Sequence, residues 1–333
     1  PVSDIPLHLT ENCDLVLRRE AIRFEVKTDK KAVQSVHFVA TLLNKNARDV
    51  AEYAVFYDNN ISIPFLEAVV YDRTGREVKK LSYRDFEDMS RISAVSILDD
   101  NRMKYAYLSH VEYPYTIEVQ YERHYNGLLH YPTWHPQYRY RQSVMNSTFE
   151  EMVPEGEHLR YKEYNVPAQA AVTQEGGSRA YLWESGALLP VCRERFMPSL
   201  ASLVPIVRTA PHDFQYEKYS GQMDSWDHVA DFVMKLNEGR QHLPETTVDR
   251  ARALVRDAPD DLEKIKRLYR FVQKNTRYIS VQLGIGGWQP WSAEFVAEHG
   301  YGDCKALTNY TMSLLQVVGI PSVYTLVRAG KDE

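Results

Sequence analysis

The chain has 333 residues, of which 44% are hydrophobic and 26% charged, and its formal net charge is −5. This composition is that of a folded globular protein rather than a disordered chain, and the near balance of charges gives no basis for nucleic-acid binding. No apolar run approaches the roughly 20 residues that span a bilayer, so we expect no transmembrane segment. The length favours two domains.

The first part of the chain has the pattern of β-structure. Residues 35–44 alternate in hydrophobicity, and residues 65–83 predict a hairpin that turns at 72–75. Residues 115–125 predict a half-buried antiparallel strand, because Ile117, Val119 and Tyr121 alternate with polar residues. We therefore expect an all-β, sandwich-like domain over residues 1–220.

Helical patterns begin near residue 221. A first helix is predicted between Asp224 and Gly239, a second over residues 246–258, and a third that begins with Asp260 and Glu263 in capping-box register. A strand over residues 278–283, a Gly- and Trp-rich loop and a short helix between Ser292 and Gly300 follow. The residues expected to face inward are Trp226, Val229, Phe232, Val233 and Leu236 in the first helix, and Leu262, Ile265, Leu268, Tyr269 and Val272 in the third.

The three cysteines, at positions 13, 192 and 304, are far apart in the chain and odd in number. No disulfide framework and no CxxC zinc motif can be drawn from them. We expect neither a metal site nor a cofactor.

Cys304 falls where a loop becomes an amphipathic helix, with Asp303 near the N-cap and Gly319 at the end, and a strand over residues 320–328 is expected to follow. A helix N-terminus favours a thiolate, and such thiols can have pKa values between about 3.5 and 7.5. The adjacent cation of Lys305 acts in the same direction. The backbone N–H of Cys304 would serve as one donor of an oxyanion hole. The alternative is that Cys304 is a small buried hydrophobic residue.

The loop over residues 284–295 is a candidate wall of a substrate groove, because its glycines allow close backbone approach and its tryptophans offer flat apolar surface. Trp288 or Gln289 is the candidate second oxyanion donor. The alternative is that Trp288 and Trp291 only cover the neighbouring helix. His299 is an upstream candidate base, with a solvent-facing helix-end histidine as the alternative.

A second aromatic cluster spans residues 130–142, "HYPTWHPQYRYRQ". Such aromatic side chains either stack against sugars or peptides, or form large cross-strand pairs within a sheet. The sequence of residues 130–142 is consistent with either role.

The order of "GGWQP", a short helix, "YGDCK", an apolar helix, "GI" and a strand resembles the core of the transglutaminase-like superfamily, circularly rearranged relatives of papain-type cysteine enzymes. The stretches "TLLNKNARDVAEYAVFYD" and "AVVYDRTGREVKKLSYRDFEDMS" are similar to the β-rich domain of unknown function that precedes such a core in many secreted or periplasmic bacterial proteins. The resemblance implies an α+β protein in which residues 221–333 form the first part of a transglutaminase-like domain.

The resemblance also implies that Cys304 is a nucleophile that attacks a glutamine or peptide-type carbonyl and forms a thioester. In the family, a His and then an Asp follow on later strands, some tens of residues downstream, and no position of this sequence matches them. We therefore expect the isolated chain to be inactive. Ala306 departs from the family pattern, because many relatives carry an Asp there.

Two functions are consistent with these residues. The first is a transglutaminase-like cysteine enzyme, acting in full-length form on peptide or protein amides by hydrolysis or acyl transfer. The second is a non-catalytic module that binds protein or glycan. The resemblance implies a periplasmic or secreted bacterial protein whose signal peptide is absent here, with a peptide or protein substrate, a cell-surface glycan or a peptidoglycan peptide as partner.

Overall fold

The structure, a computed structural model, describes residues 1–91 and 98–327, without the side chains of residues 98 and 99. In the described chain, one compact unit consists of residues 1–91 and 101–228, and a second consists of residues 98–100 and 229–327. Each unit has its own hydrophobic core.

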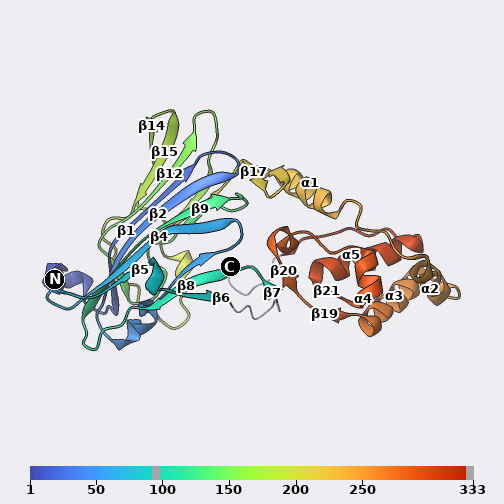
Figure 1. The fold of residues 1–333 in the computed structure, drawn as a ribbon, viewed down its shortest axis with the longest axis horizontal. Helices are drawn as coiled ribbons and strands as arrows, with labels where there is room; N and C mark the ends of the chain where they lie inside the picture. Colours follow the sequence, from blue (N-terminus) through green and yellow to red (C-terminus); the bar gives the residue numbers. More distant parts are fainter. Residues whose placement is uncertain (92–97, 328–333) are drawn as a thin grey trace. The chain divides into compact units, whose positions relative to one another are not determined.

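A nine-stranded mixed sheet dominates the first unit (Figure 1). Its strands follow the order β14-β15-β12-β1-β2-β9-β4-β5, with β11 also paired to β1. The β1 strand runs parallel to β11 and β12, whereas the other neighbours are antiparallel. The strands are β1 (Leu15–Val26), β2 (Lys31–Leu42), β4 (Ile61–Tyr71), β5 (Glu77–Ser82), β9 (Tyr115–Asn126), β11 (Gln142–Val144), β12 (Ser147–Pro154), β14 (Ala171–Glu175) and β15 (Ser178–Glu184).

Two three-stranded sheets pack on one face of the large sheet. One contributes Val55 and Ala106 to a core with β1, β2, β4 and β9, and the other contributes Trp134 and Val207 to a core with β1, β12 and β15. The opposite face of the large sheet carries mainly polar side chains. The smaller strands are β3 (Glu52–Tyr57), β6 (Glu87–Ser90), β8 (Arg102–Tyr107), β10 (Thr133–Trp134), β13 (Arg160–Tyr164), β16 (Ile206–Ala210), β17 (Asp213–Tyr216) and β18 (Tyr219–Gln222).

The strand predictions for this unit are confirmed. Residues 35–44 fall largely within β2, and β4 and β5 form the expected hairpin, in which Gly75 has φ +87°. In β9 the side chains of Ile117 and Val119 are buried in the core, while Glu118 and Gln120 lie on the other face. Polar and apolar residues alternate along β9 because only one face of the sheet is covered. This alternation predicted which side chains are buried.

The second unit is mainly helical, and the chain enters it within α1. Its core joins α2, α3, α4 and α5 around Leu268, Phe271, Val296 and Leu314. The elements are β7 (Leu98–Asp99), α1 (Trp226–Asn237), α2 (Glu245–Val255), α3 (Asp261–Asn275), β19 (Arg277–Tyr278), β20 (Val281–Gln282), a 3-10 turn (Gly284–Gly287), α4 (Ala293–His299), β21 (Tyr301–Gly302) and α5 (Cys304–Val317). Together with the first unit, this arrangement confirms the α+β class.

Helix caps follow the sequence closely. Asp260 accepts a hydrogen bond from the N–H of Glu263 at 2.8 Å, and Ser292 accepts one from Phe295 at 3.2 Å. Gly300 ends α4 in the left-handed region, with φ 69°. These caps satisfy N–H groups that a helix leaves without partners.

Several inward-facing assignments were wrong. Trp226 is 88% exposed, and Leu262 and Tyr269 of α3 are also more than half exposed. Apolar residues surround a wide arc of α3, and only the side that carries Leu268, Phe271 and Val272 meets the core. The periodicity of apolar residues gives the width of the apolar stripe on a helix. It does not show which part of that stripe is covered by neighbouring elements.

Two predicted strands also differ from the structure. Residues 278–283 contain only the last residue of β19 and the two-residue strand β20, and residues 320–327 form no strand; residue 328 lies outside the described residues. A strand requires a neighbouring strand for its backbone groups, and no described strand pairs with residues 320–327. None of the described helices is long and apolar enough to cross a membrane.

Candidate functional site around Cys304

Cys304 is the first residue of α5, and it is exposed to solvent. Asp303 caps the helix, because its Oδ1 accepts a hydrogen bond from the N–H of Ala306 at 2.9 Å. The exposed thiol therefore lies at the positive end of a helix of 14 residues. The alternative of a buried hydrophobic cysteine is wrong.

Lys305 does not direct its charge at the thiol. Its ammonium group pairs with the carboxylate of Asp303, which is only 3% exposed. The cap and the ion pair together hold Asp303 in place at the start of the helix. The positive field at Cys304 therefore arises from the helix, while the adjacent Lys and Asp largely compensate each other.

Tyr278 lies beside Cys304, which sequence analysis did not predict. Burial, followed by the charge of Cys304 and a hydrogen bond with its side chain, raises the pKa of Tyr278, whereas a hydrogen bond from the backbone N–H of Cys304 lowers it. The parallel pairing of β19 with β21 sets Tyr278 opposite Gly302, two residues before the cysteine. The phenol thus contacts both the thiol and the N–H expected to serve an oxyanion.

A second tyrosine lies near the same residues. Burial, with further effects from Cys304 and Asp303, raises the pKa of Tyr324 to about 12. Tyr324 belongs to the extended segment after α5, so three separate parts of the chain converge on the thiol. No short motif could have indicated this, because the residues are 20 or more positions apart.

Neighbouring helices hold the Gly- and Trp-rich loop in place. Gln289 donates from Nε2 to the carbonyl of Leu236 at 3.1 Å, and Arg240 donates to the carbonyl of Pro290 at 3.1 Å. The N–H groups of Trp288 and Gln289 both donate to the carbonyl of Ile285. The N–H groups of Trp288 and Gln289 and the side chain of Gln289 therefore already have hydrogen-bond partners. They could bind an oxyanion only if the loop changed its hydrogen bonds.

Trp291 and His299 belong to one aromatic stack. Trp291 packs edge-on against Phe295 with ring centroids 4.0 Å apart, and Phe295 stacks on His299 at 4.1 Å. His299 Nδ1 lies 3.0 Å from the carbonyl oxygen of Phe295, at the exposed end of α4. These contacts support the helix-covering role for Trp291 and the helix-end role for His299.

Gly302 and Ala306 pack in direct contact. A Cβ placed on Gly302 would lie 2.8 Å from the Cβ of Ala306, which is completely buried. The small residue at position 306 thus allows β21 to approach the first turn of α5. Its departure from the family pattern has a packing reason in this chain.

The comparisons with known proteins agree with this organisation. Residues 28–191 match a domain of unknown function, DUF3857, and residues 248–331 match the transglutaminase-like superfamily. The chain therefore carries a DUF3857 domain followed by a transglutaminase-like core, as the sequence resemblance implied. No curated protein matches the chain.

Among solved structures, the chain is similar to a protein from Parabacteroides distasonis that is provisionally described as a protease, with a TM-score of 0.70 and 15% identity. The match covers 92% of this chain and 59% of that one, so the chain spans well under two thirds of its structural neighbour. An M1 zinc metallopeptidase from Deinococcus radiodurans matches with a TM-score of 0.31 and 9% identity, over 73% of this chain and 53% of that one. The first likeness concerns the fold, and the second is too low to carry an argument.

Proposed function

We propose that the complete protein is a transglutaminase-like cysteine enzyme that acts on peptide or protein amides. Cys304 is its nucleophile, and the observation that carries this role is an exposed thiol at the N-terminus of α5 within a transglutaminase-like core. The Parabacteroides neighbour described as a protease supports the same class of chemistry.

In this reaction the Cys304 thiolate forms a C–S bond to the amide carbonyl carbon, and the C–N bond breaks as the amine leaves with a proton from the general acid. Water or a second amine then attacks the thioester and regenerates the thiol. By family resemblance the base and its orienting carboxylate are a His and an Asp, and no position of this sequence matches them. We therefore expect no amidase turnover from these 333 residues alone.

The first unit would position the substrate or a partner of the enzyme. Its match to a domain that accompanies transglutaminase-like cores supports such an accessory role. By the same resemblance, the protein acts in the bacterial periplasm or outside the cell.

The test compares two cysteines in one molecule. Cys192 and Cys304 are both exposed, but only Cys304 begins a helix. We expect iodoacetamide to alkylate Cys304 at least about 10-fold faster than Cys192 at neutral pH, as measured by mass spectrometry of the peptides. Equal rates would instead favour the non-catalytic module, in which Cys304 is chemically ordinary.

A further inference from the structure

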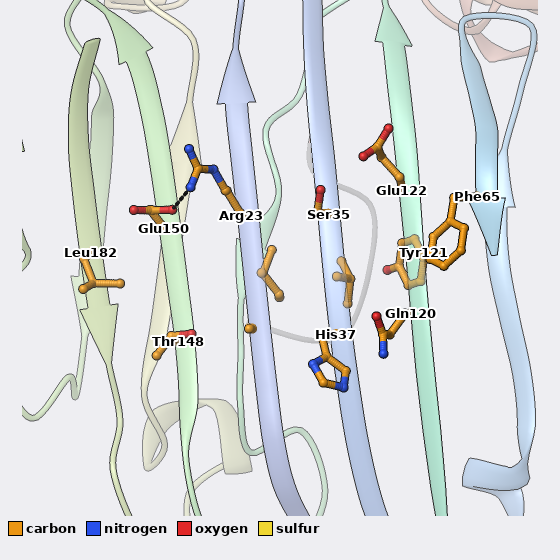
Figure 2. Close-up of a pocket in the computed structure, with 13 residues that line it drawn as sticks. Arg23, Ser35, His37, Phe65, Gln120, Tyr121, Glu122, Thr148, Glu150 and Leu182 are labelled. Carbon is orange, nitrogen blue, oxygen red and sulfur yellow. Dashed lines mark ion pairs between the residues drawn. The ribbon is translucent and has the colours of Figure 1, made fainter. Parts of the chain in front are cut away.

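The open face of the large sheet carries a continuous row of side chains from six neighbouring strands. Each residue is the register partner of the next, so the row crosses β15, β12, β1, β2, β9 and β4 (Figure 2). The row has apolar ends and a polar middle. Its members are Leu182, Glu150, Arg23, Ser35, Glu122 and Phe65.

A hollow of about 490 Å³ lies along this row. It lies where the short side chains of Ala21 on β1 and Ser35 on β2 occupy diagonal places in the middle of the sheet, with the longer His37 and Arg23 as their register partners. Five strand spacings of roughly 4.8 Å separate Leu182 from Phe65, which gives a length of about 24 Å. The hollow is therefore a shallow groove across the strands rather than a deep pocket.

Hydrogen bonds and ion pairs fix the polar side chains of this groove. Arg23 lies 3.2 Å from Glu150, the ion pair drawn in Figure 2. His37 Nε2 lies 2.6 Å from Glu118 Oε1, and Gln120 donates to the same oxygen at 3.3 Å. Side chains held in this way on rigid strands lose little freedom when a ligand binds.

The backbone of the groove floor offers nothing to an extended peptide. The strands β12, β1, β2 and β9 each pair with neighbours on both sides, so their N–H and C=O groups are already used. Peptides that bind sheets by main-chain hydrogen bonds require a free edge. Recognition on this face must therefore come from side chains.

The charges of the groove also disfavour a polyanion. Among the described lining residues, two carboxylates, of Glu122 and Glu150, stand against the one guanidinium of Arg23. Ser35, Thr148 and Gln120 add neutral hydrogen-bonding side chains. Phe65, which is 45% exposed, adds a flat apolar ring at one end.

We propose that this groove binds a neutral oligosaccharide. Sugar hydroxyls both donate and accept hydrogen bonds, which suits a face where Arg23, Ser35, His37 and Gln120 lie near the carboxylates of Glu122 and Glu150, and the apolar face of a sugar ring stacks on Phe65. The groove extends over the length of several sugar rings. The site lies wholly within the first unit, and its ligand binding is independent of Cys304.

The experiment titrates the full 333-residue chain with three neutral tetrasaccharides by isothermal titration calorimetry. The probes are the β-1,4-linked tetramers of glucose and of N-acetylglucosamine and the α-1,4-linked tetramer of glucose. We expect at least one of them to bind, with a dissociation constant on the order of 0.1 to 1 mM. The Cys304→Ser variant should bind it equally well, which separates this test from that of the catalytic role.

Two variants then locate the binding. Phe65→Ala and Gln120→Ala should each weaken it about 10-fold, because one loses the stacking ring and the other a hydrogen bond. Phe196→Ala, the same change at a residue that is 94% exposed outside the sheet, should bind as the parent does. Thermal unfolding of each variant establishes that it is folded.

The proposal is overturned if none of the three tetrasaccharides binds at millimolar concentration. Unchanged binding in both Phe65→Ala and Gln120→Ala would overturn it as well, because the sugar would then bind elsewhere. Binding of a neutral Gly-Ser-Ala decapeptide in place of every saccharide would assign the groove to peptides instead.

Discussion

The phenol of Tyr278 lies beside the thiol of Cys304, although 26 positions separate the two residues in the chain. The same phenol lies close to the backbone N–H of Cys304, which lowers the pKa of Tyr278. In the proposed enzyme, a substrate oxyanion would compete with Tyr278 for that N–H. Tyr278 is therefore the residue most directly placed to tune the thiol.

Replacement of Tyr278 by Phe should slow the alkylation of Cys304 at neutral pH by about 10-fold, because a donor to the thiolate stabilises the anion by about 1.5 kcal/mol. At strongly alkaline pH the two proteins should react at similar rates. Iodoacetamide labelling across this pH range measures both effects. A variant that reacts faster at neutral pH would show that the phenol shields the thiol rather than stabilises it.

Removal of the charge of Asp303 should activate the thiol. In Asp303→Asn the side-chain oxygen still accepts the hydrogen bond of Ala306, while Lys305 loses its carboxylate partner. We expect Cys304 to be alkylated several-fold faster at neutral pH, on the order of 3- to 10-fold.

The matched control is Asp260→Asn, the same change at the N-cap of α3, which accepts from Glu263 in the same way. It should leave the labelling rate of Cys304 unchanged. An equal change in both variants would mean that loss of cap stability, not charge, controls the reactivity of the thiol.

An alanine at Gly302 should destabilise the second unit by about 1–3 kcal/mol, because its Cβ would lie 2.8 Å from the Cβ of Ala306 and 3.3 Å from Val296. Urea unfolding followed by circular dichroism measures this cost. Gly286→Ala is the control, since no atom lies within 4 Å of a Cβ built there. If the two variants unfold alike, the contact between β21 and α5 is looser than the structure indicates.

Glu151 makes stability dependent on pH. Its side chain is completely buried, and among the described residues neither carboxylate oxygen has a hydrogen bond of normal geometry. Burial raises the pKa of Glu151 well above 4.5, despite a small opposing effect of Thr209. The unfolded chain releases this proton near pH 4.5, whereas the folded chain retains it. The contribution of Glu151 to stability is therefore fully present below that pH and falls as pH rises towards the folded pKa, by up to about 1.4 kcal/mol per pH unit.

Replacement of Glu151 by Gln should remove this component, so the variant should gain stability relative to the parent between pH 5 and pH 8. Urea unfolding followed by the fluorescence of the buried Trp134 and Trp183 measures the difference. Glu175→Gln, the same change on an exposed strand, should show no such gain. A parallel pH dependence in the parent and in Glu151→Gln would mean that Glu151 ionises without penalty. Glu20, whose pKa burial raises to about 7, contributes in the same direction and is unchanged in both proteins.

The sequence predicted local features of the site well. The cap of Asp303, the start of α5 at Cys304 and the short helix between Ser292 and Gly300 all depend on contacts within one helical turn. The alternation in β9 likewise predicted its buried face. The α+β class followed from these patterns and from the family resemblance.

Interactions between distant residues could not be predicted in the same way. The sequence suggested that Lys305 would support the thiolate, but its side chain pairs with Asp303 instead. The exposed side of α3 was also assigned wrongly, because a helical pattern does not specify which neighbours will cover it.

The sequence by itself determined the helix caps, the buried face of β9, which cysteine starts a helix, and which family the two parts resemble, because capping and periodicity act over a few consecutive residues. Only the tertiary structure decided that Tyr278 meets Cys304 and that Ala21 and Ser35 leave a hollow in the large sheet. Both depend on the register between strands, which packing of the whole unit sets and no single stretch of sequence encodes.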